Sequence, residues 1–228
     1  MSSHLLFAKR FFVTSFLVLA SIAAFSQTYI LNEDFSSASG TTPPEGWSNV
    51  TVTGDAEDLW RFDNAGGRDI KYPMIGTFAI FDSDNTSRNQ MAENVFLETP
   101  AFDATISQQI LFSFDHWFVG GDNAKASIEA YDGEEWKVVK IYTTTTENSE
   151  KEILDISGFV GGVPNSKLRF RWEGDSVGLW AIDNISIYTH RRHNGRYFQR
   201  HINQTFHSTL SLRPFIIRQR HQTYVNFI

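Results

Sequence analysis

The sequence predicts an all-β protein that folds as an antiparallel two-sheet sandwich. Three observations carry this prediction: apolar and polar residues alternate at period two, turn residues recur at short intervals, and helical periodicity is almost absent after residue 26. Alternation at period two puts every second side chain on one face of a strand, so one face packs on a core and the other meets water. Many short strands of this kind are typical of two face-packed sheets.

The clearest strands are residues 168–173 and 110–118, each with large apolar side chains along one face. The Asp132-Gly133 pair predicts a tight hairpin, because glycine adopts the positive φ of such turns. The remaining expected strands are residues 29–35, 59–62, 77–81, 94–99, 126–131, 136–142, 153–156 and 179–188.

Residues 1–26 have the pattern of a cleavable signal peptide. The basic pair Lys9 and Arg10 precedes an apolar run that ends in small residues before Gln27. The run has about fifteen residues, whereas a helix needs roughly twenty to cross a bilayer. We therefore expect a secreted or cell-surface protein without a transmembrane span after cleavage; an uncleaved N-terminal anchor is the alternative. The chain has no cysteine, so its fold must depend on a hydrophobic core.

Charge is unevenly distributed along the chain. All 26 acidic residues lie between Glu33 and Asp183, and residues 27–188 hold only 11 lysines and arginines, which gives a net charge of −15. We expect these residues to form one domain that favours cations and repels nucleic acid. Residues 189–228 contain seven arginines but no acidic residue and no lysine. We expect poor order there, and three interpretations stay open: a cationic tail that binds an anionic surface or nucleic acid, a sorting segment, or out-of-frame sequence.

Several motifs, in this order, resemble a known family: Glu33-Asp34-Phe35, Pro43-Pro44-Glu45-Gly46-Trp47, Leu59-Trp60, residues 96–102, and residues 178–187 with Trp180-Ala181-Ile182-Asp183-Asn184-Ile185. They resemble the cleaved-adhesin and MAM-like (choice-of-anchor J) domains of exported bacterial surface proteins. The resemblance implies an antiparallel jelly-roll sandwich with a structural calcium site and no catalytic centre. It also implies a binding or adhesion module for an extracellular glycan or protein, carried in many relatives by a larger surface protein with a C-terminal sorting domain. No such sorting domain is recognisable after Tyr188.

Four carboxylates are the expected calcium ligands: Glu33, Asp82, Asp84 and Asp183. Glu33 and Asp183 lie in apolar strand contexts, where an ionised carboxylate needs a cation or hydrogen-bond donors. Asp82 and Asp84 end a strand with alternating oxygen ligands, without the glycine and distal glutamate of an EF-hand. Calcium takes about six to eight oxygen ligands, which loops at one end of a sandwich bring together. Turn-capping and solvated acids are the alternative.

The six tryptophans all lie within residues 27–188, and exposed aromatic rings stack on sugars or on a partner's surface. Trp172 and Trp180 are expected in the core because they fall on inward positions. Trp47, which follows two prolines, and Trp117, which shares the outward face with Asp115, are the expected ligand contacts. Core packing is the alternative for both.

The sequence thus favours a non-catalytic binding module, with two alternatives. One is a secreted glycoside hydrolase or lyase with a carboxylate pair, for which Glu129, Asp132, Glu134 and Glu135 are candidates, although an exposed, solvated hairpin turn is the better explanation for the acids in 132–135. Asp115 and His116 point to opposite faces of a strand, so they cannot act as a pair. The sequence has no zinc-binding spacing, phosphate loop or dinucleotide motif. The other alternative is a structural repeat unit of a larger surface protein.

Overall fold

The structure is a computed structural model, and it describes residues 27–86, 92–105, 109–121, 123–175 and 177–190. The expected signal peptide and the tail from residue 191 lie outside these ranges. The final strand continues to His190, two residues past the expected end of the domain. A helix with the length and hydrophobicity that a bilayer crossing requires is not found within the described ranges.

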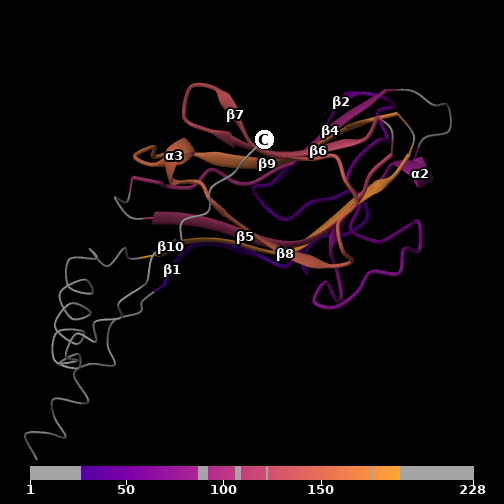
Figure 1. The fold of residues 1–228 in the computed structure, drawn as a ribbon, viewed down its shortest axis with the longest axis horizontal. Coiled ribbons are helices and arrows are strands. Elements are labelled where there is room, and N and C mark those ends of the chain that lie inside the picture. Colours follow the sequence, from indigo (N-terminus) through magenta and orange to yellow (C-terminus); the bar gives the residue numbers. More distant parts are fainter. Residues whose placement is uncertain (1–26, 87–91, 106–108, 122, 176, 191–228) are drawn as a thin grey trace, which may run out of the picture. The chain divides into compact units, whose positions relative to one another are not determined.

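The described residues form two antiparallel sheets. Their strands are β1 (Thr28–Glu33), β2 (Ser48–Thr53), β3 (Ala79–Asp82), β4 (Glu93–Glu98), β5 (Gln109–Val119), β6 (Lys125–Tyr131), β7 (Trp136–Tyr142), β8 (Glu150–Asp155), β9 (Lys167–Gly174) and β10 (Leu179–His190), with the short helices α2 (Ser83–Thr86) and α3 (Ser157–Val160). The first sheet, which we call the β10 sheet, has the order β1-β10-β5-β8, and β3 also pairs with β10. The second, the β9 sheet, has the order β2-β4-β9-β6-β7. The two sheets lie face to face (Figure 1), which confirms the antiparallel jelly-roll sandwich.

The strands differ from the expected ones at two places. Residues 59–62 form no strand, and an isolated bridge joins Arg61 to Ile80 instead. The sequence does not predict β2, whose residues are exposed or half-buried throughout. An edge strand without a fully buried face lacks the strong alternation by which strands are recognised.

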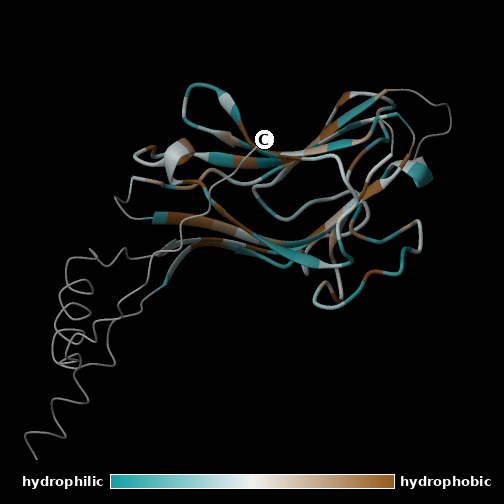
Figure 2. Cartoon of the chain, in the orientation of Figure 1, coloured by the Kyte–Doolittle hydropathy of each residue, from teal (hydrophilic) through white to brown (hydrophobic). Residues whose placement is uncertain are grey.

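Aromatic side chains join the two sheets. The ring of Trp60 lies 5.6 Å from that of Trp180 and 6.4 Å from that of Phe170, while Phe81 lies 5.6 Å from Trp172. All five side chains are fully buried, so the expected core positions of Trp172 and Trp180 are confirmed. Apolar and polar residues alternate along the strands that enclose this core (Figure 2), as the period-two pattern requires.

A second, smaller apolar cluster lies on the opposite face of the β10 sheet. Leu179 and Ala181 of β10 belong to it, whereas Trp180 and Ile182 belong to the main core. Successive residues of β10 thus point into two different apolar clusters. The outer cluster is buried because a segment before β3 covers the outer face of this sheet.

The predicted hairpin between β6 and β7 is confirmed. Gly133 has a φ of +96°, and Oδ1 of Asp132 accepts hydrogen bonds from the N–H groups of Glu134 and Glu135 at 3.0 and 2.9 Å. The turn therefore uses the aspartate as a local acceptor and the glycine for the positive φ.

Gly178 leads into β10 with a φ of +105°, and a Cβ built there would lie 2.2 Å from the carbonyl oxygen of Val119. We expect Gly178→Ala to lower the free energy of unfolding by about 2–4 kcal/mol, because the β5 backbone cannot yield without losing its pairing with β10. Urea unfolding followed by tryptophan fluorescence measures the change. The matched control is Gly158→Ala in α3, where the added Cβ meets nothing within 4 Å and we expect a change below about 1 kcal/mol. Equal destabilisation by both variants would contradict this explanation.

Candidate functional site

The outer face of the β9 sheet carries aromatic and charged side chains. Strands β4, β9 and β6 pair so that Glu98, Arg169 and Glu129 lie side by side. The neighbouring residues Leu168 and Phe170 point inward and are fully buried, so the alternation leaves the charged residues outside. We call this surface the aromatic–arginine face; it consists of Phe96, Glu98, Glu129, Tyr131, Trp136, Lys167, Arg169 and Arg171.

Arg169 is at the centre of this face. Its guanidinium carbon lies 4.1 Å from the ring centroid of Trp136 and 4.9 Å from that of Phe96, so the cation contacts two aromatic rings. Its Nη2 lies 2.5 Å from Oε2 of Glu129. The Trp136 ring also packs on Tyr131, with 5.4 Å between centroids. These contacts fix Trp136 while leaving it half-buried, and a fixed, partly open aromatic ring suits ligand stacking.

Charges are balanced within the aromatic–arginine face. Nζ of Lys167 lies 2.7 Å from Oε1 of Glu98. Nε of Arg171 donates a hydrogen bond of 2.9 Å to Oδ1 of Asn94, and its Nη1 lies 3.5 Å from Oε1 of Glu129. Because each of these basic groups lies close to a carboxylate, the face presents hydrogen-bond donors and acceptors rather than a strong electrostatic field of one sign.

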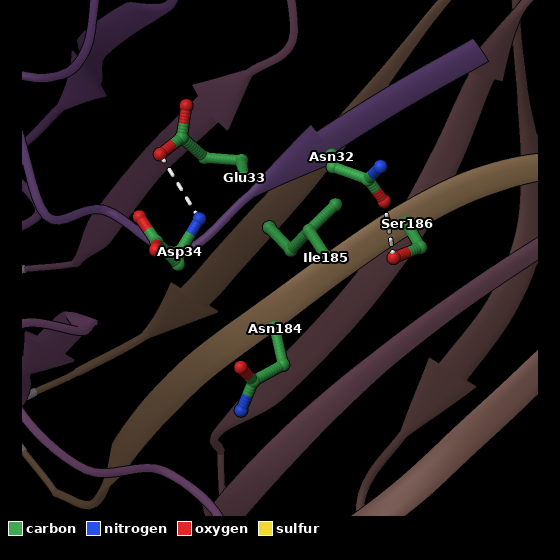
Figure 3. A pocket seen from close by; sticks show the side chains of 6 residues that line it. All are labelled: Asn32, Glu33, Asp34, Asn184, Ile185 and Ser186. Atoms are coloured by element: carbon green, nitrogen blue, oxygen red, sulfur yellow. Dashed lines mark hydrogen bonds between the residues drawn. The ribbon is translucent and has the colours of Figure 1, made fainter. Parts of the chain in front are cut away.

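A pocket of about 350 Å³ lies beside β1 and β10, and we call it the acidic pocket. Its lining residues are Asn32, Glu33, Asp34, Asn184, Ile185 and Ser186 (Figure 3). The backbone adopts positive φ on both sides of it, +55° at Phe35 and +53° at Asn184. Oε1 of Glu33 accepts hydrogen bonds from the N–H groups of Phe35 at 2.7 Å and Asp34 at 3.1 Å. The Glu33 carboxylate therefore stabilises the backbone conformation of the residues that directly follow β1.

Asp183 adjoins the acidic pocket and is only 2% exposed. It lies directly opposite Asp115 of β5, whose Oδ1 is 2.9 Å from Nζ of Lys151. Burial raises the pKa of Asp183 to about 7, and the negative charges of Asp115, Asp34 and Glu33 add to the rise, while the N–H of Asn184 opposes it. A buried carboxylate among other carboxylates is stabilised by a cation.

The acidic pocket matches calcium in donor type, since carboxylate, amide and hydroxyl oxygens surround it. Glu33, Asp34 and Asp183 are the residues that would hold the ion. Among the described residues, however, no group of three or more His, Cys, Asp or Glu side chains is arranged to hold a metal. Calcium binding at Glu33 and Asp183 stays a prediction.

Asp82 and Asp84, the other two expected calcium ligands, belong to a network around Arg68, whose Nη2 lies 2.6 Å from Oδ1 of Asp82 and 2.9 Å from Oδ2 of Asp84. Oδ1 of Asp84 also accepts a hydrogen bond of 3.0 Å from the N–H of Gly178. The two aspartates therefore anchor neighbouring chain segments. Calcium binding by these two aspartates stays a prediction.

Trp47 and Trp117, the expected ligand contacts, both pack against other residues of the domain. Trp47 is 8% exposed and packs edge-on against Phe35, with 5.4 Å between ring centroids. Trp117 points outward as expected but is half-buried against the small cluster that contains Met74 and Leu179. Sequence reasoning assigned no role to Trp136. Its position beside an Asp-Gly turn, opposite Tyr131 on the partner strand, is the signal that could have identified it.

The candidate catalytic acids have structural contacts. Glu129 binds Arg169 and Arg171, and Asp132 stabilises the hairpin turn and binds Lys137 at 2.5 Å. Asp115 and His116 point to opposite faces of β5, as expected: the fully buried His116 contacts the Phe114 ring in the core at 5.2 Å between centroids.

Comparisons with known proteins bear on the fold. No protein-family model matches the chain, and no curated protein matches it. Among solved structures, the K1 cleaved adhesin domain of Lys-gingipain from Porphyromonas gingivalis W83 is 15% identical with a TM-score of 0.53, over 71% of this chain and 97% of that one. The K3 domain is 14% identical with a TM-score of 0.52, over 72% and 99%. A structure of TmCBM61 in complex with beta-1,4-galactotriose is 14% identical with a TM-score of 0.48, over 72% and 99%. The described domain thus has a cleaved-adhesin-like jelly-roll fold.

Asp183 makes the stability of the metal-free domain depend on pH. Its pKa of about 7 exceeds the value of about 4 in an unfolded chain, so the folded state binds this proton more tightly and ionisation opposes folding. We expect the stability of the wild type relative to Asp183→Asn to fall as pH rises from about 4 to 7, at up to about 1.4 kcal/mol per pH unit. Urea unfolding of both proteins in a chelating buffer measures the difference. A difference that stays constant with pH would refute this assignment.

Proposed function

We propose that this jelly-roll domain is a non-catalytic binding module of an exported protein and that its aromatic–arginine face binds a glycan. The contact geometry of Trp136 is the observation that carries the proposal. The ring is held by Arg169 and Tyr131 and remains partly open to solvent. A fixed aromatic ring loses little conformational entropy when a sugar ring stacks on it.

The charges of this face favour a neutral glycan. Lys167, Arg169 and Arg171 lie near the acids Glu98 and Glu129, and hydroxyl groups both donate to carboxylates and accept from guanidinium groups. Residues 27–188 carry a net charge of −15, which repels polyanions at long range. In Figure 1 the β9 sheet is bowed, with β7 and β2 rising on either side of its central strands.

A binding role fits the carboxylates better than hydrolysis does. A glycoside hydrolase needs two carboxyl groups that flank the scissile bond, one of them free to donate a proton. The carboxylates Glu98 and Glu129 are instead engaged by basic side chains. The fold shared with cleaved adhesin domains is in keeping with a binding role.

We also propose that calcium binds the acidic pocket and has a structural role. The buried Asp183 supports this, because a cation would offset the cost of its ionisation. Glu33 and Asp34 line the pocket, and their negative charges act on Asp183. The ion would link the end of β1 to the bulge of β10, and no catalytic step depends on it.

Trp136→Ala tests the glycan proposal. We expect it to weaken binding of a neutral oligosaccharide, chosen from an array of neutral and acidic glycans, by about tenfold or more through loss of stacking. Isothermal titration calorimetry measures the affinity, and near-ultraviolet circular dichroism checks the fold. The matched control is Tyr29→Ala, an aromatic residue on the β10 sheet that is 53% exposed. Unchanged binding by Trp136→Ala, or selection of acidic glycans, would contradict the proposal.

Calcium should raise the thermal midpoint, because a ligand that binds only the folded state stabilises it. With the affinities of extracellular calcium modules, a concentration of about 10 mM should give roughly 3–10 °C. We expect Asp183→Asn to abolish the shift and Asp84→Asn to retain it. Magnesium at equal concentration controls for ionic strength. The proposal fails if calcium has no effect on the wild type, and a shift lost only in Asp84→Asn moves the site to the Arg68 network.

A further inference from the structure

Residues 63–78, which we call the Tyr72 loop, pack on the outer face of the β10 sheet. Met74 is 1% exposed and Phe78 is 7% exposed, and both lie in the small cluster with Leu179 and Ala181 of β10. In Figure 1 the corresponding purple segment extends beyond the strands of this sheet. The loop therefore has its own apolar anchor.

Polar contacts fix the loop at further points. Arg68 forms two hydrogen bonds to Asp82, of 2.7 and 2.6 Å. The side chain of Asn148 accepts from the N–H of Lys71 at 3.0 Å and donates to the carbonyl of Asp69 at 2.9 Å. A loop fixed at several points presents its remaining side chains in one orientation, which lowers the entropic cost of binding a partner.

Tyr72 and Ile75 are the side chains that this loop presents. They are 79% and 67% exposed, more than any other exposed large hydrophobic residue in the described ranges. Met74, which lies between them in the sequence, supplies the apolar anchor of the loop. The two exposed side chains therefore contribute little to the stability of the fold. Exposed apolar side chains held on a fixed scaffold are a feature of interaction surfaces, and tyrosine is enriched where binding energy concentrates.

The surroundings of the pair are acidic. The carbonyl of Pro73 accepts a hydrogen bond of 3.3 Å from Nδ2 of Asn184, a residue that lines the acidic pocket with Glu33 and Asp34. On the other side, Asn148 is preceded by the exposed Glu147. Lys71, the basic residue next to Tyr72 in the loop, is paired with Asp69. Charge complementarity therefore favours a cationic partner.

We propose that Tyr72 and Ile75 form a protein-binding surface that takes a basic segment of a partner. An apolar side chain of that segment packs on the pair, and a neighbouring lysine or arginine is attracted by the exposed Glu147 beside Asn148, which leaves the acids of the pocket to calcium. Anionic lipid surfaces and nucleic acids are repelled by the net negative charge of residues 27–188. This surface lies on the β10 sheet, whereas the aromatic–arginine face lies on the β9 sheet. The domain thereby holds a glycan and a protein at separate sites.

A library of random dodecapeptides, selected on the immobilised full chain, tests the proposal. We expect enriched peptides to combine lysine or arginine with large apolar residues. The affinity of the best synthetic peptide should fall at least about tenfold in the double variant Tyr72→Ala/Ile75→Ser. It should also fall as salt rises, chiefly through a slower association rate. Both substituted side chains are largely exposed, so we expect the variant to fold.

Matched controls separate this surface from the glycan face. Val52→Ser replaces an apolar residue on β2 that is 56% exposed, and it should leave peptide binding unchanged, as should Trp136→Ala. The double variant should retain glycan binding. Enriched peptides without basic residues, or peptide binding that is insensitive to the double variant, would overturn the proposal. So would glycan binding lost in the double variant, or a dimer in sedimentation analysis that this variant dissociates, since a sugar or a second copy would then be the occupant.

Discussion

The aromatic packing between the two sheets is the interaction on which the rest of the structure depends. The chain has no cysteine, so no disulfide joins the sheets. Trp60, Phe170 and Trp180 fill the space between them with ring centroids 5.5 to 6.4 Å apart. A large aromatic side chain contributes about 1.5–3 kcal/mol when it is fully buried. Because this core uses the inner face of the central strands, the chemistry available for recognition lies on the outer faces, at the loops and at the sheet edges.

The outer faces of the two sheets differ in the arrangement of their charges. On the β9 sheet, alternation puts Arg169 and Arg171 of one strand beside Glu129 of the next, so opposite charges neutralise each other around aromatic rings. On the β10 sheet, Asp115 and Asp183 lie directly opposite each other, and like charges in such a pair repel. The first face suits a neutral, hydroxyl-rich ligand, while the second attracts cations, whether a metal ion or a basic side chain.

The candidate sites could be predicted only in part from the sequence. Glu33 and Asp183 stand out as acids within apolar strands, and the fold brings them to the same neighbourhood. The partner of Asp82 could not be inferred, because Arg68 lies in a loop whose path depends on the packing of Met74. Trp47 looks exposed after two prolines, yet Phe35 covers it. Trp136 gives no local sign that it lies beside Arg169, since the two meet only across the sheet.

The sequence by itself determined the class of fold, the faces of the main strands and the hairpin at Gly133. Each of these follows from local rules, because side-chain direction alternates along one strand and a tight turn depends on adjacent residues. Tertiary structure decided the strand order, the aromatic–arginine face, the acidic pocket and the exposure of Tyr72. These features depend on which strands, distant in the sequence, pair with each other. That pairing is set by the burial of the aromatic core, which involves both sheets together.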